Sequence, residues 1–286
     1  MKPPNILTKE KWLRYLDEGK IVDLSKFTGI SDEAAESVEG NCGGDLDLCG
    51  LTDISSKLAK TLAKHGPPAW EIDLSGLETL SEGAASELGK RIGGIRLNGL
   101  REITPTIARH LAQPRLQDSY ETASIYRGED FASGEFIDTY RLLLNGLQCL
   151  PAPVARELSR HTGGLYLDGI KTMPDESAAS LGRHLGCLSL NGISALSDKA
   201  LSSLSRQRGN LFLNGLTALS PPAAFALGNH RQDIFLGGLK KLSYSAAISL
   251  TRNLSDDNGT YLHIGCTTKM AKKTKTFLEG KQYGII

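Results

Sequence analysis

The sequence predicts an α/β solenoid, a coil of repeated strand–turn–helix units, and three observations support this. One six-residue pattern recurs, as "IRLNGL" at 95–100, "LLLNGL" at 142–147, "LSLNGI" at 188–193 and "LFLNGL" at 211–216. Most consecutive units start 23 residues apart, with single intervals of 26 and 47 residues, which indicates a repeat architecture. A helical pattern follows each occurrence. The unit starts are Leu46, Ile72, Ile95, Leu142, Leu165, Leu188, Leu211 and Ile234, with a weaker ninth unit at 261–266.

The first element of each unit is expected to be a short strand. Positions 1 and 3 of the unit, such as Leu211 and Leu213, are apolar, whereas position 2 varies from Asp to Phe. Alternation of this kind is typical of a strand with one buried face.

The second element is expected to be a bend. Asn214-Gly215 between apolar residues is a strong hairpin signal, but "TALSPPAAFAL" follows it, which is a capped helical pattern and not a second strand. We therefore expect the chain to turn into the next side of the coil, with Gly supplying an unusual backbone angle. Cys49, Ser75 and Asp168 replace the Asn in other units, so the Gly is expected to matter more than the Asn.

The third element is expected to be a helix of about two turns. Position 10 is usually Ser, Thr or Pro, and Ser and Thr are preferred helix N-caps. Positions 13, 14 and 17 are mostly Ala and Leu, as in Ala84, Ala85 and Leu88, and these positions share one helical face.

Stacking of such units explains why they would fold. One unit is too small to offset an ordering entropy of roughly 1–2 kcal/mol per residue. A stack completes the backbone hydrogen bonds of the strands and buries a continuous apolar ladder. Strands entered from the same side run parallel and return through the helical half, with right-handed crossovers. Because the helices are bulkier, parallel strands are expected on the concave face and short helices on the convex face.

The units "GGLYLDGIKTM" and "GNLFLNGLTAL" resemble leucine-rich repeats over about 40–270. They are similar to 23-residue bacterial repeats with a short helix. Leu or Ile occupies position 6, where the Asn of the common pattern would fall, so the usual Asn ladder is expected to be absent. The resemblance implies a right-handed leucine-rich-repeat solenoid that binds other macromolecules, usually proteins, and it implies no shared chemistry.

Three segments are expected along the chain: an N-terminal cap helix with a degenerate first repeat (1–44), the solenoid (45–265) and a C-terminal cap or tail (266–286). In the first, 8–18 place Trp12, Leu13 and Leu16 on one helical side. The tail carries several lysines, interpreted as a solvated cap face, with a basic patch for an acidic partner as the alternative. The irregular segment 113–140 is interpreted as a degenerate repeat, with a protruding binding loop as the alternative.

Composition excludes several classes of function. The net charge of +1 argues against a nucleic-acid partner or an anionic membrane surface. The sequence contains neither a signal-peptide pattern nor a membrane span, and its five scattered cysteines are typical of a reduced, cytoplasmic protein. It also lacks the common hydrolase, metalloprotease and nucleotide-binding motifs, so no catalytic residue, cofactor, metal or small-molecule substrate is predicted.

Histidines recur at position 20 of the unit. His161 and His184 would be stacked neighbours and could share a metal ion or serve an enzyme. The preferred interpretation is a polar cap for the helix end, because other residues also occupy this position. The position holds His65, Arg91, His161, His184, Gln207, His230 and Asn253.

Positions 0 and 2 of the strands are expected to line the concave surface, which changes from acidic through basic to aromatic along the chain. We therefore expect a protein partner to be bound there, because aromatic residues and Arg are enriched at protein interfaces. A stacked pair of neighbouring Phe side chains is the simpler explanation of the aromatic part. The predicted partner-binding residues are Tyr166, Phe212 and Phe235, with Asp47, Glu71, Asp73 and Arg96 for electrostatic selectivity.

Overall fold

The computed structural model describes residues 4–17, 22–37, 44–66, 70–113, 140–252, 261–265 and 269–279. Its main feature is a nine-stranded parallel sheet whose strands follow one another in chain order. The same position of each unit pairs across the sheet, as in Leu188↔Leu211 and Ser189↔Phe212. The strands are β3 (Leu46–Asp47), β4 (Glu71–Asp73), β5 (Gly94–Arg96), β6 (Leu142–Leu143), β7 (Leu165–Tyr166), β8 (Leu188–Ser189), β9 (Leu211–Phe212), β10 (Ile234–Leu236) and β12 (Leu262–Ile264).

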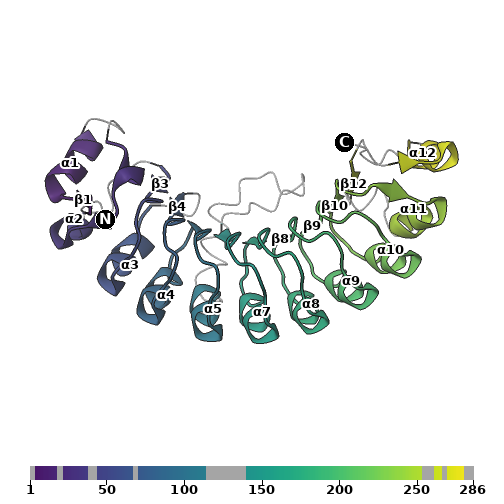
Figure 1. Ribbon diagram of the computed structural model, residues 1–286, viewed down its shortest axis with the longest axis horizontal. Helices are drawn as coiled ribbons and strands as arrows, with labels where there is room; N and C mark the ends of the chain where they lie inside the picture. Colours follow the sequence, from purple (N-terminus) through teal and green to yellow (C-terminus); the bar gives the residue numbers. More distant parts are fainter. Residues whose placement is uncertain are drawn as a thin grey trace, which may run out of the picture.

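A short helix follows nearly every strand and packs against the helix of the next unit. The units form an arc with the strands on its inner side and the helices on its outer side (Figure 1). The predicted α/β repeat solenoid is therefore confirmed. These helices are α3 (Ser56–Ala63), α4 (Glu82–Leu88), α5 (Pro105–Leu111), α7 (Ala152–Leu158), α8 (Asp175–Leu181), α9 (Asp198–Leu204), α10 (Pro221–Leu227) and α11 (Tyr244–Thr251).

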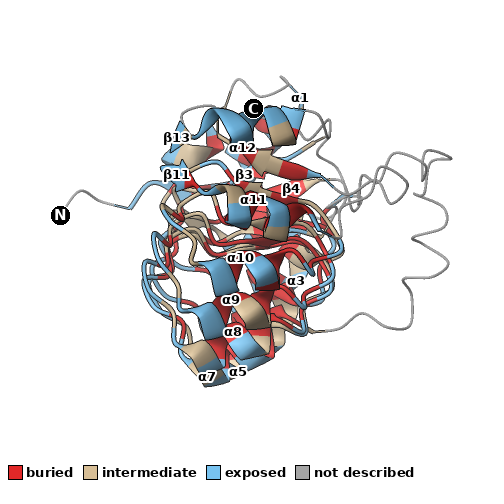
Figure 2. Ribbon diagram, turned by 90° about the vertical axis from the view of Figure 1, so that its right-hand side faces the viewer, coloured by how far each residue is buried: buried red, intermediate tan, exposed pale blue. Residues whose placement is uncertain are grey.

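The core lies between the sheet and the helices, where buried residues run along the inward sides of both (Figure 2). Positions 1, 3 and 6 of the units are almost completely inaccessible, as at Leu211, Leu213 and Leu216. The Ala and Leu of positions 13, 14 and 17 close the other side, as at Ala84, Ala85 and Leu88. This ladder continues without a break through the stack, as the periodicity predicts.

The helix starts are capped as predicted. In six units the side chain at position 10 accepts a hydrogen bond from the backbone N–H three residues later, which supplies a partner that the helix itself cannot provide. Pro151 and Pro174 take this position in two other units and make no side-chain cap. The capping residues are Ser55, Ser81, Thr104, Ser197, Ser220 and Ser243.

The glycine at position 5 has a different role from the one expected. Gly215 does not have a positive φ; the positive-φ glycines of the described ranges are Gly44, Gly66 and Gly93. A Cβ at Gly215 would instead lie 2.2 Å from the Asn191 carbonyl oxygen and 2.6 Å from that of Ile193. Successive turns of the coil approach too closely here for any side chain. The expectation of an unusual backbone angle is therefore wrong, and the requirement for glycine is steric.

The usual Asn ladder would lie at position 6, which holds Leu or Ile, but a ladder of a different kind forms at position 4. The Asn145 side-chain oxygen accepts from the Asp168 backbone N–H at 2.9 Å, and Asp168 accepts in the same way from Asn191 at 2.8 Å. The contact recurs from Asn98 to Asn145, from Asn191 to Asn214 and from Asn214 to Gly237. Each amide or carboxylate therefore satisfies the backbone of the following unit.

In the described part of the N-terminal region, five short elements precede the main sheet. Helix α1 (Lys9–Asp17) buries Trp12 and Tyr15, and the Trp12 indole donates to the Ser37 carbonyl at the end of α2 (Asp32–Ser37), 3.0 Å away. Leu13, expected on the buried side of the helix, is 44% exposed, so this part of the expectation is wrong. Strand β1 (Ile6–Leu7) pairs in parallel with β2 (Gly29–Ile30), and a short 3₁₀ turn, η1 (Leu24–Lys26), lies between.

The C-terminal end carries a second small sheet of β11 (Lys241–Leu242) and β13 (Lys269–Met270), followed by α12 (Lys272–Glu279). Leu278 of α12 is buried, whereas Lys272, Lys273 and Lys275 are exposed. Thus the described part of the predicted tail forms an amphipathic helix against the last full unit.

The two units on either side of the 47-residue interval are direct neighbours in the sheet. Ile95 of β5 pairs directly with Leu142 of β6, and α5 packs against α7. No additional strand therefore separates these two units in the sheet. The internal structure of the irregular segment 113–140 lies almost entirely outside the described residues.

Candidate binding surface on the concave face

The concave surface is formed by positions 0 and 2 of the strands, whose side chains point away from the core. The structure places all seven predicted partner-binding residues in these strands. They fall into an N-terminal group with charged side chains and a C-terminal group with aromatic side chains. The first is Asp47 in β3, Glu71 and Asp73 in β4, and Arg96 in β5; the second is Tyr166 in β7, Phe212 in β9 and Phe235 in β10.

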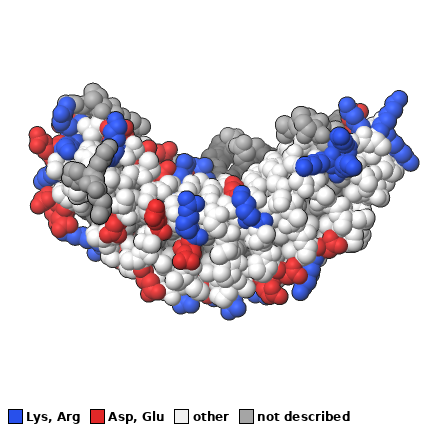
Figure 3. All heavy atoms as spheres, viewed as in Figure 1, with Lys and Arg blue, Asp and Glu red and all other residues white. Residues whose placement is uncertain are grey.

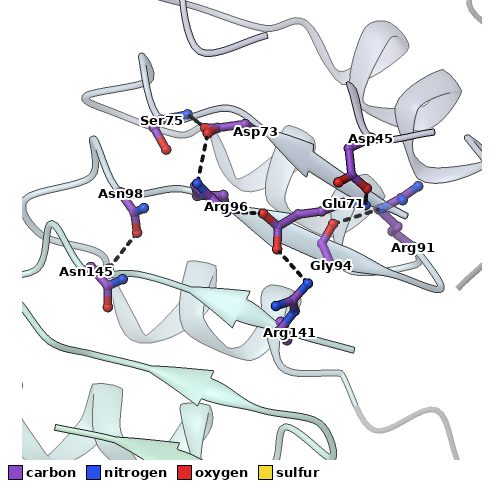
Figure 4. Close-up of polar contacts among 10 residues, drawn as sticks. All are labelled: Asp45, Glu71, Asp73, Ser75, Arg91, Gly94, Arg96, Asn98, Arg141 and Asn145. Carbon is purple, nitrogen blue, oxygen red and sulfur yellow. Dashed lines mark hydrogen bonds and ion pairs between the residues drawn. The ribbon is translucent and has the colours of Figure 1, made fainter. Parts of the chain in front are cut away.

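Three side chains of the N-terminal group, Glu71, Asp73 and Arg96, form a charge cluster together with Arg141 (Figure 4). The Arg96 guanidinium donates to Glu71 Oε1 at 2.5 Å and lies 3.6 Å from Asp73 Oδ2. The Arg141 guanidinium, from just before β6, lies 3.5 Å from Glu71 Oε2. Arg141 occupies position 0 of its unit and was not among the predicted binding residues.

Glycine at position 94 allows Glu71 to reach Arg141. Gly94 pairs with Glu71 in the sheet and precedes Arg141 in the same row. A Cβ at Gly94 would lie 3.2 Å from both Cγ and Oε2 of Glu71, so the Glu71 side chain extends across the space left by the missing side chain. Glu71 is consequently only 8% exposed, although position 0 was expected to face the solvent.

The aspartates at position 2 also have a structural role. Asp73 Oδ1 accepts from the Ser75 backbone N–H at 2.8 Å, and Asp47 Oδ1 accepts from that of Cys49 at 3.1 Å. Cys49 and Ser75 occupy position 4 of their units, and in both a carboxylate two residues earlier accepts from the backbone N–H that elsewhere binds a ladder residue of the preceding unit. A hydrogen bond with the Asp47 carboxylate, together with burial, raises the pKa of the Cys49 thiol to about 11.

The C-terminal group contains an aromatic stack of Phe212, Phe235 and His263. The Phe212 and Phe235 rings lie 4.3 Å apart between centroids at 13°, and His263 stacks on Phe235 at 4.0 Å and 3°. All three rings are partly exposed on the concave side. His263 was missed as a member of this surface, although its register with Phe235 in the ninth strand is the signal that identifies it.

Tyr166 is not part of this stack. Ser189 lies between Tyr166 and Phe212 in the same row, and its hydroxyl donates to Asp168 at 2.6 Å. The structure thus brings Phe212 and Phe235 together, and it brings Glu71, Asp73 and Arg96 together. Tyr166 lies between these two groups, one strand after Arg141, and Asp47 lies at the N-terminal edge of the sheet.

The polar residues at position 20 bind backbone carbonyls. His161 Nε2 is 2.8 Å from the Tyr140 oxygen, and His184 Nε2 is 3.2 Å from that of Cys187. Gln207 donates to the Gly209 carbonyl at 2.5 Å, and Arg91 donates to that of Trp70 at 2.7 Å. The expected cap of a helix end is seen for Arg91, which contacts the Leu62 carbonyl, and for His230, which contacts that of Ser205, whereas the four contacts above reach carbonyls of the loops.

The geometry of His161 and His184 is relevant to the alternative in which they share a metal ion. The rings of His161 and His184 are nearly parallel with centroids 6.4 Å apart, and each directs Nε2 at a carbonyl. Within the described ranges, no three His, Cys, Asp or Glu side chains gather closely enough to hold a metal ion. Burial lowers the pKa of His184, and hydrogen bonds to carbonyls oppose this shift only in part.

A further group of Lys and Arg side chains lies at the C-terminal end of the arc on the face seen in Figure 3. Lys241 of β11 pairs with Lys269 of β13, and α12 adds three further lysines. Lys273 Nζ lies 4.2 Å from the centre of the Tyr244 ring, and Lys275 Nζ lies 3.8 Å from a Glu279 carboxylate oxygen. Two of these lysines thus already have partners at this end of the solenoid.

The fold and this surface define the chain as a repeat solenoid with a parallel sheet along its concave face. No protein-family model matches the sequence, and no curated protein matches it either. None of the described helices is long and apolar enough to cross a membrane.

Proposed function

We propose that the protein is a non-enzymatic binding scaffold whose concave face holds a protein partner. The observation that carries this proposal is the row of partly exposed Phe212, Phe235 and His263 rings on the same sheet face as the charge cluster. Stacked rings on a rigid surface can bury a large apolar area with little loss of side-chain entropy, and arginine is the charged residue most frequent in binding hot spots. Phe235 covers only one face of the Phe212 ring, so the stacking of the two rings does not by itself explain why Phe212 is partly exposed on this surface.

We further propose that the units are a variant of the leucine-rich repeat. The ladder at position 4 supports this, because it performs the function that the resemblance assigns to an Asn ladder, namely satisfaction of backbone N–H groups between units. In this variant the ladder residue lies directly after the strand. The repeats of this class are a binding architecture, which agrees with the proposed role of the concave face.

Two alternatives stay as proposals of lower rank. One is recognition through the irregular segment 113–140, most of which lies outside the described residues. Deleting it should then abolish partner binding while the stack remains folded. The other is a metal or enzymatic role for His161 and His184, which the carbonyl contacts of both Nε2 atoms disfavour.

Affinity capture from the native source tests the scaffold proposal. Wild-type protein and a Phe212→Ala, Phe235→Ala double variant would be immobilised, and the bound proteins would be identified by mass spectrometry and confirmed by titration. We expect the double variant to lose about tenfold or more in affinity, because truncation of buried aromatic anchors has effects of this size. Phe225→Ala is the matched control, since Phe225 is 53% exposed on the convex helix α10.

Thermal unfolding would confirm that each variant remains folded. Equal binding by the wild type and the double variant would refute the site. Loss of binding in the Phe225→Ala control instead would place the interface on the helical side.

A further inference from the structure

We propose that the concave face binds an extended peptide segment that places an acidic side chain on Arg141 and an apolar side chain, about four to six residues away, on the aromatic stack. This inference rests on the proposed function and specifies the chemistry of the partner. Two observations support it: the unequal pairing of the two arginines in the charge cluster, and the position of Arg141 on the same sheet face as the aromatic rings.

Arg141 is paired with fewer carboxylates than Arg96. Arg96 is held between two carboxylates, Glu71 at 2.5 Å and Asp73 at 3.6 Å. Arg141 faces one carboxylate oxygen at 3.5 Å, and among the described residues Glu71 Oε2 accepts no hydrogen bond. The Arg141 side chain is also 43% exposed. A guanidinium has five N–H donors in a planar fork that matches a carboxylate, so Arg141 can hold Glu71 on one side and a second carboxylate on the other.

The position of Arg141 in the repeat adds to this capacity. Its neighbours in the position 0 row are Gly94 on one side and Gly164 on the other, neither of which has a side chain. Glu71 extends across Gly94 and restrains the guanidinium, which lowers the entropy that a ligand must remove. Arg141 is therefore a restrained cation that projects from a part of the concave surface where its neighbours in the row have no side chains.

The aromatic stack lies at a distance that a short peptide can span. Phe212 is in β9, three strands after β6, and Phe235 is in the next strand. At about 4.8 Å per strand these rings lie about 14–19 Å from Arg141 along the sheet, which an extended chain covers in about four to six residues. The two contacts thus lie in adjacent rows of the same sheet face, positions 0 and 2, and follow the long axis of the arc.

The charges beyond the cluster give the peptide a direction. Asp45 and Asp47 are exposed at the N-terminal edge of the sheet, next to β4. An acidic side chain would be repelled there and a basic one attracted. The ligand that fits the surface has, in order along the sheet, a basic group over β3 and β4, an acidic group at Arg141, and an apolar group over β9 and β10.

Selection from a random library of displayed peptides, each about twelve residues long so that it exceeds the span between the sites, tests this on the full chain. We expect the enriched peptides to share an Asp or Glu four to six residues from a large apolar residue. Synthetic peptides from the enriched set would then be titrated into the wild type and into Arg141→Gln. A loss of about tenfold is expected, because charge-assisted hydrogen bonds to a carboxylate are among the strongest polar contacts. Arg141→Lys should retain only part of the affinity, since Lys lacks the planar fork.

Arg156→Gln is the control, because Arg156 is exposed on the convex helix α7 of the same unit. Enriched peptides without an acid, or peptides that bind Arg141→Gln as tightly as wild type, would overturn the inference. If those peptides still require Phe212 and Phe235, the scaffold function stands and only the acidic contact fails. If no peptide is enriched, the peptide proposal is refuted, and the affinity capture described above decides the proposed function separately.

Discussion

At the scale of single residues, the recurring Asn-Gly dipeptide has two separate roles. The Asn side chain joins one unit to the next through a hydrogen bond to the backbone, as from Asn145 to Asp168. The Gly permits the backbones of neighbouring units to touch, as Gly215 does against Asn191. Both roles concern contacts between units, which explains why the dipeptide recurs in phase with the repeat.

Gly215→Ala should destabilise the protein because the new methyl group would meet two backbone carbonyls at 2.2 and 2.6 Å. Overpacking of this kind costs about 1–3 kcal/mol, and backbone atoms cannot move aside as side chains can. Gly83→Ala is the control: Gly83 is exposed in α4, and its Cβ would meet the rotatable Ser56 hydroxyl. Denaturant unfolding should show a loss for Gly215→Ala and no loss for Gly83→Ala, since Ala favours a helix over Gly. Equal losses would contradict the steric explanation.

Asn145→Ala should cost about 1–3 kcal/mol, the penalty for an unsatisfied backbone donor, because it removes the acceptor of the Asp168 N–H. Asn145→Asp should restore most of this stability, since Asp168 itself accepts the same bond at the next step of the ladder. The free energy of unfolding measures both effects. If Asn145→Asp were as unstable as Asn145→Ala, the ladder would not be the source of the effect.

At the scale of elements, each helix is held by its cap and by its neighbours. Two-turn helices are too short to be stable alone in water, so most of their stability comes from packing. Helix α1 differs from the repeat helices because it packs chiefly on α2, at one end of the stack. Its largest buried side chain is Trp12, whose indole also binds the Ser37 carbonyl.

Trp12→Ala should therefore loosen the N-terminal end more than the centre of the solenoid. Removing a buried aromatic side chain costs about 3–5 kcal/mol, and in a repeat array such losses act mainly on adjacent units. Hydrogen exchange should accelerate in α1 and α2 while α8 and α9 keep their protection. Trp12→Phe, which keeps a ring and loses only the indole N–H, should show a smaller effect. Uniform acceleration along the whole chain would contradict a capping role for this segment.

At the scale of the whole molecule, the buried histidines make stability depend on pH. Burial is the main cause that lowers the pKa values of His65, His184 and His230 from the usual 6.5. The unfolded chain therefore binds protons near pH 6.5 that the folded chain does not bind until the pH is lower. Protonation favours unfolding in this window, so stability should be complete above the unfolded pKa and fall as the pH drops below it.

The triple variant His65→Gln, His184→Gln, His230→Gln should lose less stability than wild type between about pH 7 and 5, because the amide does not titrate. Gln207 already occupies this position in one unit and binds a carbonyl. The reverse change, Gln207→His, should steepen the pH dependence. Melting temperatures across the pH range measure both variants, and parallel curves for all three proteins would exclude the histidines as the cause.

Much of the fold could be predicted from the sequence because the same type of residue recurs at each position in many units. The strands, the N-caps and the buried Leu and Ala positions all follow from periodicity, and periodicity survives substitution in any one unit. The candidate binding surface was predictable only in outline. Register alone places Glu71 and Arg96 in neighbouring strands, but the path of Glu71 across Gly94 to Arg141 depends on side-chain packing.

By itself, then, the sequence determined the unit, its period, the parallel stacking and which positions enter the core, because these follow from local backbone preferences and the burial of apolar side chains. Contacts between units were decided only in the tertiary structure. The Asn ladder, the need for glycine and the stack of Phe212, Phe235 and His263 join residues at least 20 positions apart. Such contacts form or fail when the spacing between neighbouring turns changes by a few tenths of an ångström. The sequence of a single turn does not specify that spacing.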